Sequence, residues 1–354
     1  MESTSKVRGR IPWVDTLRFL GIYFIYLAHY GEAAPRIHPI IFIFAMPLFF
    51  GLSGGMEAIS TEKEFWPRIF KKIKTILLPY FFFIGISLIL ATILNQSSFP
   101  GVLSTLREIL AAQRNTLFAP MLWFLPALFL TELIFMLMRL VLKPAWALLL
   151  ASTIIYIFLH LFMHDPLITP QWFWNLDTSL FYLFYYALGY WGFPKLLRVL
   201  GDGSKRPPLW FTAGGMLSAG YSLALLFDKE FLTEALAAID QVPVIRNGVP
   251  VANALIIIWA LLLAALILQP FKLLQKIGRE TLYLCGNEYI VKLLLNQSLG
   301  LLGLAVAPQN PLAAYLLSFF LILAAVFILI PFERRLYQRL LQFFGLEKLP
   351  APGA

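Results

Sequence analysis

Long apolar segments recur along the whole chain and constrain its fold more than any other feature. A membrane-spanning helix needs roughly 20 apolar residues. Ten segments of about this length lie near residues 12–30, 39–59, 75–94, 120–141, 145–163, 178–193, 209–227, 250–270, 281–304 and 311–331. Only 13% of the residues are charged, about half the share found in soluble domains, so lipid must be the solvent for much of the exterior. The sequence therefore predicts an all-α fold, a polytopic membrane helix bundle of about ten transmembrane helices.

Lysine and arginine are distributed unevenly between alternate connections. If the N-terminus is inside, the cytoplasmic segments hold 21 of these residues and the outer segments hold 5. Positive charge is retained on the cytoplasmic side of membrane proteins, so we predict that both termini are cytoplasmic. This placement relates the net charge of +9 to membrane lipid rather than to nucleic acid.

The chain has no evident internal repeat and no appended soluble domain. We therefore expect residues 1–354 to form a single transmembrane domain. From about residue 333 a short basic amphipathic tail is expected to lie on the inner membrane surface. The single cysteine, Cys285, leaves no internal disulfide, and His160 and His164 lack a third ligand, so no metal site is predicted.

The first apolar segment carries three ionisable residues, Asp15, Arg18 and His29. Such residues are costly inside a membrane and are functional candidates. Arg18 and His29 are eleven residues apart, which places them on one helix face roughly 16 Å apart. That separation resembles an extended pantetheine arm, with a CoA phosphate on Arg18 and His29 as general base at an acceptor hydroxyl. Alternatively, Asp15 pairs with Arg18 one turn on, and His29 hydrogen-bonds a neighbouring helix.

Two further features follow in the second and third apolar segments. Ser53 lies beside two glycines, where small residues either allow close helix packing or give a thioester room beside His29. A basic run then precedes the third span, with Arg68, Lys71, Lys72 and Lys74. It either anchors anionic lipid and sets topology or holds the phosphates of CoA at the inner mouth.

Polar residues also interrupt the ninth span. Glu288 and Lys292 are four residues apart, so they either neutralise each other as an ion pair or, together with Asn287, contribute to acceptor binding. Glu132 in the fourth span has the same two interpretations.

Several short motifs occur in a fixed order along the chain. They are Asp15-x-Leu17-Arg18 followed by His29, Phe49-Phe50-x-x-Ser53-Gly54, Leu78-Pro79-Tyr80, Leu122-Trp123-Phe124-Leu125 and Ile277-Gly278-x-x-Thr281-Leu282. In this order they resemble the acyltransferase 3 family of membrane proteins.

The resemblance implies an acyl-CoA-dependent O-acyltransferase with about ten helices in the cytoplasmic (inner) membrane of a bacterium. It implies transfer of an acyl group, most often acetyl, from cytoplasmic acetyl-CoA or another acyl-CoA to a hydroxyl of an extracytoplasmic sugar or glycan, as in modification of an envelope polysaccharide. His29 would be the essential histidine and Arg18, with Asp15 beside it, the essential arginine. Trp123, Asn287 and Glu288 are candidates for acceptor binding. Similar proteins often have a histidine in the ninth span, where this chain has Asn287 and Glu288.

The rival function is a transporter or exporter of a polysaccharide or lipid-linked sugar. Such proteins often have paired halves with broken helices at corresponding positions. The sequence contains no such symmetry, and the enzyme is therefore the favoured interpretation.

Overall fold

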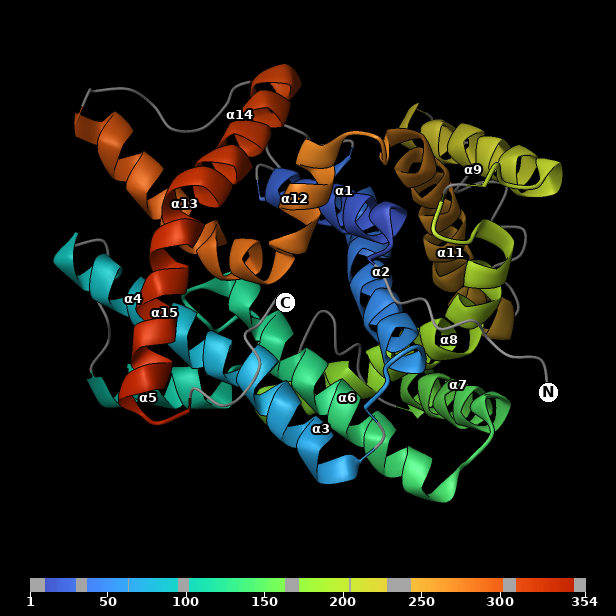
Figure 1. Cartoon of the computed structure of the whole chain (residues 1–354), viewed down its shortest axis with the longest axis horizontal. Coiled ribbons are helices and arrows are strands. Elements are labelled where there is room, and N and C mark those ends of the chain that lie inside the picture. Colours follow the sequence, from blue (N-terminus) through green and yellow to red (C-terminus); the bar gives the residue numbers. More distant parts are fainter. Residues whose placement is uncertain are drawn as a thin grey trace. The chain divides into compact units, whose positions relative to one another are not determined.

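The structure is a computed structural model of the chain, and it describes residues 10–29, 37–62, 64–94, 102–162, 172–203, 205–227, 243–301 and 310–346. In these ranges the chain consists of helices and their connections, without a β-strand (Figure 1). The chain divides into two compact units. Unit 1 comprises Met1–Phe49 and Gly192–Thr281, and unit 2 comprises Phe50–Trp191 and Leu282–Ala354.

A helix occupies each of the ten ranges predicted to span the membrane. Among the described residues, seven helical stretches are long and apolar enough to cross a membrane: Ile40–Ala58, Phe65–Ile93, Pro120–Val141, Ala145–Phe162, Leu209–Phe227, Val251–Leu268 and Pro311–Phe343. The other three helices are α1 (Pro12–Ala28), α8 (Leu176–Leu200) and α13 (Thr281–Leu301). Of these, α1 has only 17 residues, and α8 and α13 contain charged residues. The all-helical fold is confirmed, whereas the count of ten spans and the side of the termini stay predictions.

Unit 1 contains four complete helices in its described part, α1, α9 (Leu209–Phe227), α11 (Pro243–Leu268) and α12 (Lys272–Arg279), together with the adjoining parts of α2 (His38–Ala58) and α8. Helix α1 packs against α11 and α12, and α9 packs against α11. The contact with α12 depends on Gly278, because a Cβ atom there would overlap the carbonyl oxygen of Asp15. At the start of α1 the indole of Trp13 donates a hydrogen bond to the Gly201 carbonyl, 3.2 Å away. These contacts fix the helix that carries Asp15 and Arg18.

Unit 2 holds most of the helices. Its described elements are α3 (Phe65–Lys72), η1 (Ile73–Leu77), α4 (Leu78–Ile93), α5 (Val102–Ala111), η2 (Pro120–Trp123), α6 (Phe124–Val141), α7 (Ala145–Phe162), η3 (Phe173–Asn175), α14 (Pro311–Ala324), η4 (Ala325–Leu329) and α15 (Ile330–Phe343), with the adjoining parts of α2 (His38–Ala58), α8 and α13. A buried cluster joins α6, α7 and α8 and consists of Phe135, Leu148, Leu183, Tyr186 and Ala187.

Helices α2 and α8 approach each other closely through glycines. A Cβ atom on Gly54 would overlap the carbonyl oxygen of Tyr186, and one on Gly189 would overlap that of Gly51. Small residues allow this kind of backbone contact between membrane helices, so close packing, the simpler of the two interpretations of the Ser53 segment, is confirmed at Gly54. The contact fixes the last turns of α2, which end one turn beyond Gly54 with Glu57.

Two short π-helical segments, η1 and η4, each lie just before a proline. Pro79 follows η1, and Pro331 follows η4, each two residues after the segment ends. A proline has no N–H and its ring crowds the carbonyl four residues earlier, so the helix must change its hydrogen-bond pattern there. The wider π turn is that change.

The first π segment leaves one backbone carbonyl for a partner from another helix. The N–H of Leu78 bonds the carbonyl of Ile73, and the next donor in the series would be Pro79, which has none. The carbonyl of Lys74 instead accepts a hydrogen bond from the hydroxyl of Tyr337 on α15, at 3.1 Å. The basic segment of α3 and η1 is therefore connected to α15.

Candidate functional site

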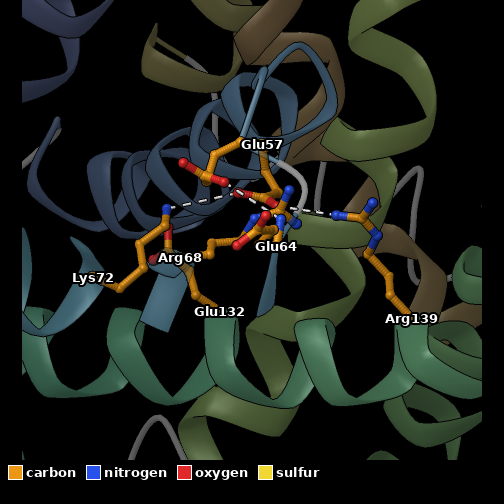
Figure 2. A network of polar contacts seen from close by, with 7 residues as sticks. Glu57, Glu64, Arg68, Lys72, Glu132 and Arg139 are labelled. Atoms are coloured by element: carbon orange, nitrogen blue, oxygen red, sulfur yellow. Dashed lines mark hydrogen bonds and ion pairs between the residues drawn. The ribbon is translucent and has the colours of Figure 1, made fainter. Parts of the chain in front are cut away.

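Four charged side chains of unit 2 converge around the buried carboxylate of Glu57 (Figure 2). Its Oε1 atom accepts a hydrogen bond from Arg139 at 3.1 Å and forms an ion pair with Arg68 at 2.7 Å. Lys72 lies 3.8 Å from the other oxygen of Glu57 and 2.9 Å from Oε1 of Glu132. We call these five residues the Glu57 network.

Helical spacing explains why these side chains meet. Arg68 and Lys72 are four residues apart in α3, and Glu132 and Arg139 are seven apart in α6, so each pair lies on one helix face. Glu57 lies at the end of α2. The network thus joins three helices by their charges.

The network holds three cations and two carboxylates, and the exposed carboxylate of Glu64 lies among the same side chains (Figure 2). Moving ions from water into a protein interior costs several kcal/mol per ion, and only good geometry offsets that cost. Within the described residues, two buried atoms of the network have no hydrogen-bond partner, Nε of Arg68 and Oε2 of Glu132. These unused polar atoms suit an additional polar group better than a closed structural ion pair.

The four residues of the basic run that were predicted to bind CoA separate into two sets. Arg68 and Lys72 come together in the Glu57 network. Lys71 is exposed, and Lys74 is buried with its ammonium donating to the carbonyl of Leu346 at 3.4 Å. Ser53 is half-buried on α2, one turn before Glu57.

Helix α1 runs unbroken from Pro12 to Ala28. Arg18 lies 3.5 Å from the carboxylate of Asp15, one turn earlier, so the ion pair that the sequence left as an alternative is present. His29 is the C-terminal cap residue of α1 and is half-buried. Because the helix is continuous, Arg18 and His29 are separated along its axis by roughly 16 Å.

The ninth predicted span is α13, and its polar residues are paired. Lys292 and Glu288 form an ion pair at 2.6 Å. The amide nitrogen of Asn287 donates to Glu333 at 2.5 Å and to the Tyr283 carbonyl at 3.0 Å. Both partners of that nitrogen are acceptors, so the amide can point only one way. Its Oδ1 atom is buried and has no hydrogen-bond partner among the described residues.

Trp123, the other predicted acceptor-binding residue, packs beside a strained connection. The guanidinium of Arg114 lies over its ring, 5.0 Å from the centroid. The amide of Asn175 closes the connection by accepting from the Arg114 N–H and donating to the Ala112 carbonyl, each at 2.6 Å. Ala112 and Asn175 both have positive φ angles, a conformation that costs of order 1–3 kcal/mol per residue and concentrates at functional sites.

Sequence reasoning missed four residues that the structure brings to these sites: Glu57, Arg139, Glu333 and Arg114. A signal existed for Glu57, a lone carboxylate inside a predicted span. Arg139 and Arg114 were counted only among the basic residues that indicate membrane topology. Glu333 was assigned to the amphipathic tail on the membrane surface. Within the described ranges, no group of three His, Cys, Asp or Glu side chains could hold a metal ion.

Comparison with families of known proteins gives a match. The acyltransferase 3 family, described as an acyltransferase domain, matches residues 11–331. No curated protein and no solved structure matches the chain. The family match begins just before α1 and ends at the start of α15, so it contains the Glu57 network and the polar residues of α1 and α13.

Proposed function

The chain belongs to the acyltransferase 3 family, and from this premise we propose that it is a membrane O-acyltransferase that uses acyl-CoA. It moves an acyl group, acetyl in the first instance, from cytoplasmic acyl-CoA to a hydroxyl of an extracytoplasmic carbohydrate. The observation that carries the proposal is the family match over nearly the whole chain. The protein acts as a multi-pass protein of a bacterial inner membrane with both termini inside.

Donor binding is assigned to basic side chains, because CoA carries phosphates that arginine binds through two parallel hydrogen bonds. Arg18 in unit 1 is half-exposed and its charge is only partly used, by Asp15 at 3.5 Å. In unit 2, Arg68 and Lys72 belong to a network that contains three cations. Exposed Lys71 adds to the local positive potential, whereas buried Lys74 supports the helix through Leu346.

Proton transfer is assigned to His29. An imidazole in water titrates near the operating pH, and this property suits a general base that removes the proton of an acceptor hydroxyl. The hydroxyl oxygen then attacks the thioester carbonyl, the carbon–sulfur bond breaks, and CoA leaves as the thiol after taking up a proton. The separation of Arg18 and His29 along α1 supports this role, because it matches an extended pantetheine arm between phosphate and thioester.

Acceptor binding is assigned to Trp123 and Asn287. An indole ring offers a flat apolar face to a sugar ring, and Arg114 beside it offers hydrogen-bond donors. The unpaired Oδ1 of Asn287 could accept a hydroxyl hydrogen. Glu288 is engaged by Lys292, so its part in binding would be indirect.

The rival function, export of a polysaccharide or lipid-linked sugar, has less support. The family whose members resemble the chain transfers acyl groups, and a transporter has no need of a histidine and an arginine at this spacing.

The test is turnover of radiolabelled acetyl-CoA by the purified protein in detergent. We expect slow hydrolysis or transfer by the wild type and its loss in His29→Ala. His38→Ala is the matched control, because His38 lies at the start of α2 beside exposed Phe42. Wild-type turnover in His29→Ala would exclude the catalytic role of His29. Absence of turnover and of saturable CoA binding in the folded wild type would favour the transporter.

A further inference from the structure

We propose that Glu57 is the resident counter-ion of an anion site formed by Arg139 and Lys72, and that a phosphate of the acyl donor replaces it on Arg139. The inference rests on the proposed function and deepens it in two ways. It adds Arg139 to the donor-binding residues, and it makes Glu57 a competitor of the donor rather than a part of its site.

The first argument is the way in which one carboxylate oxygen is shared. Oε1 of Glu57 accepts a hydrogen bond from Arg139 at 3.1 Å and also forms an ion pair with Arg68 at 2.7 Å. Arg139 therefore shares this acceptor with a closer cation. A phosphate group has several oxygens and could bind Arg139 through two parallel hydrogen bonds, which the shared oxygen of Glu57 does not provide.

The second argument is access. The side chains of Arg139 and Lys72 are 30% and 19% exposed, whereas those of Arg68 and Glu57 are 8% and 3% exposed. An anion that enters the network must meet Arg139 and Lys72 first. The Arg68–Glu57 pair lies behind them and can remain intact during the exchange.

The third argument is the position of the Arg139 guanidinium. It lies over the ring of Tyr190, 5.2 Å from the centroid. A ring against one face restricts the guanidinium and leaves its N–H edges directed to acceptors in its plane. The hydrogen bond to Glu57 is the one that Arg139 makes within the described residues. Its other N–H groups are thus suited to an incoming anion.

The fourth argument is charge. Arg68, Lys72 and Arg139 place three positive charges in one cluster, and the attraction between an anion and these charges is strengthened where water is scarce. Glu57 reduces the attraction, because its negative charge lies beside the same guanidinium. Removal of that charge should therefore strengthen anion binding, whereas loss of a residue that merely scaffolds the site should weaken it.

The test is calorimetric titration of CoA into the purified full chain in a neutral detergent. We expect Glu57→Gln to bind CoA on the order of 10-fold more tightly, since a charge-assisted hydrogen bond contributes about that much to affinity. Arg139→Gln should bind it on the order of 10-fold more weakly. The double variant should lose the gain of Glu57→Gln. Lys143→Gln is the matched control, because Lys143 is an exposed cation just after α6 and outside the network.

Two arms distinguish the possible phosphates. Dephospho-CoA lacks the 3′-phosphate and so reports whether this phosphate is the group that binds. If it is, the difference in affinity between wild type and Glu57→Gln should be smaller for dephospho-CoA than for CoA. Nanodiscs of phosphatidylcholine with or without phosphatidylglycerol report whether a lipid headgroup takes the site. Thermal stabilisation of Glu57→Gln by phosphatidylglycerol, without a change in CoA affinity, would overturn the assignment to the donor.

The remaining outcomes separate the inference from the proposed function. If folded Glu57→Gln binds CoA no more tightly than wild type, Glu57 is no competitor. If Glu57→Gln does not fold, Arg139→Gln decides, and an affinity equal to that of Lys143→Gln overturns the proposal. A folded wild type that binds no CoA contradicts the proposed function itself.

Discussion

Glu333 on α15 accepts a hydrogen bond from the amide of Asn287 on α13 at 2.5 Å, and both side chains are buried. One turn further along α15, Tyr337 donates to the carbonyl of Lys74. The segment expected from sequence to be a surface tail thus has a buried face that connects α13 with the basic run after α3. The same relationship fixes the orientation of the Asn287 amide, so it supports both the fold and the acceptor-binding proposal.

The first prediction concerns this hydrogen bond. Glu333→Ala should lower the stability of the protein by about 1–3 kcal/mol, because it leaves a buried N–H of Asn287 without an acceptor. Glu333→Gln keeps an acceptor oxygen in the same place and should lower the stability by less than Glu333→Ala does. The midpoint of thermal unfolding in detergent measures both, with Gln338→Ala at an exposed position of α15 as control. Equal midpoints for Glu333→Ala and the control would contradict the role of the bond.

The second prediction concerns the approach of α2 and α8. Gly189→Ala should destabilise the protein by about 1–3 kcal/mol, the usual cost of overpacking, because its methyl group would overlap the backbone of Gly51. Gly192, one turn along α8, has open space around it. Gly192→Ala should be neutral or slightly stabilising, since alanine favours a helix by about 1 kcal/mol. Similar effects of the two substitutions on thermal unfolding would be evidence against the close approach.

The helices could be predicted from the sequence because hydropathy alone locates them. Each of the ten predicted ranges is helical. The π segments could not be predicted so directly, because Pro79 and Pro331 look like ordinary helix interruptions until their neighbours' hydrogen bonds are known. The role of α15 was missed for a different reason, since its basic exposed face dominates its composition and its buried face is only a few residues wide.

The candidate site could be predicted only in part. Arg18 and His29 could be proposed as site residues because one helix sets their spacing, and this assignment stays a prediction. The Glu288–Lys292 ion pair could be predicted because i,i+4 neighbours meet on any helix. The Glu57 network depends on contacts between residues up to 82 positions apart. No local sequence pattern contains such a contact. Arg139 was therefore counted only among the basic residues that indicate membrane topology.

The third prediction separates two adjacent lysines. Lys72→Gln should destabilise the protein by about 3–5 kcal/mol, the cost of leaving a buried charge without its partner, because Glu132 loses the ammonium at 2.9 Å. Lys71→Gln removes the same charge from an exposed position and should change stability little. Thermal unfolding compares them. The double variant Lys72→Gln with Glu132→Gln should recover part of the loss, and no recovery would show that the pair does not account for it.

The last prediction concerns Arg18 and distinguishes a donor-binding role from a structural one. If Arg18 binds a phosphate of the donor, Arg18→Gln should raise the KM for acetyl-CoA on the order of 10-fold, as loss of a charge-assisted hydrogen bond would. If Arg18 serves only to pair with Asp15 at 3.5 Å, the substitution should lower stability by up to about 1 kcal/mol, as for half-exposed ion pairs, and leave KM unchanged. Arg10→Gln is the control, because Arg10 is an exposed cation just before the same helix.

Asp15→Asn adds a second distinction. It removes the ion pair but keeps the arginine, so it should leave the KM for the donor unchanged or lower it. A parallel rise of KM in Asp15→Asn and Arg18→Gln would mean that the ion pair, and not the free guanidinium, is what the donor requires.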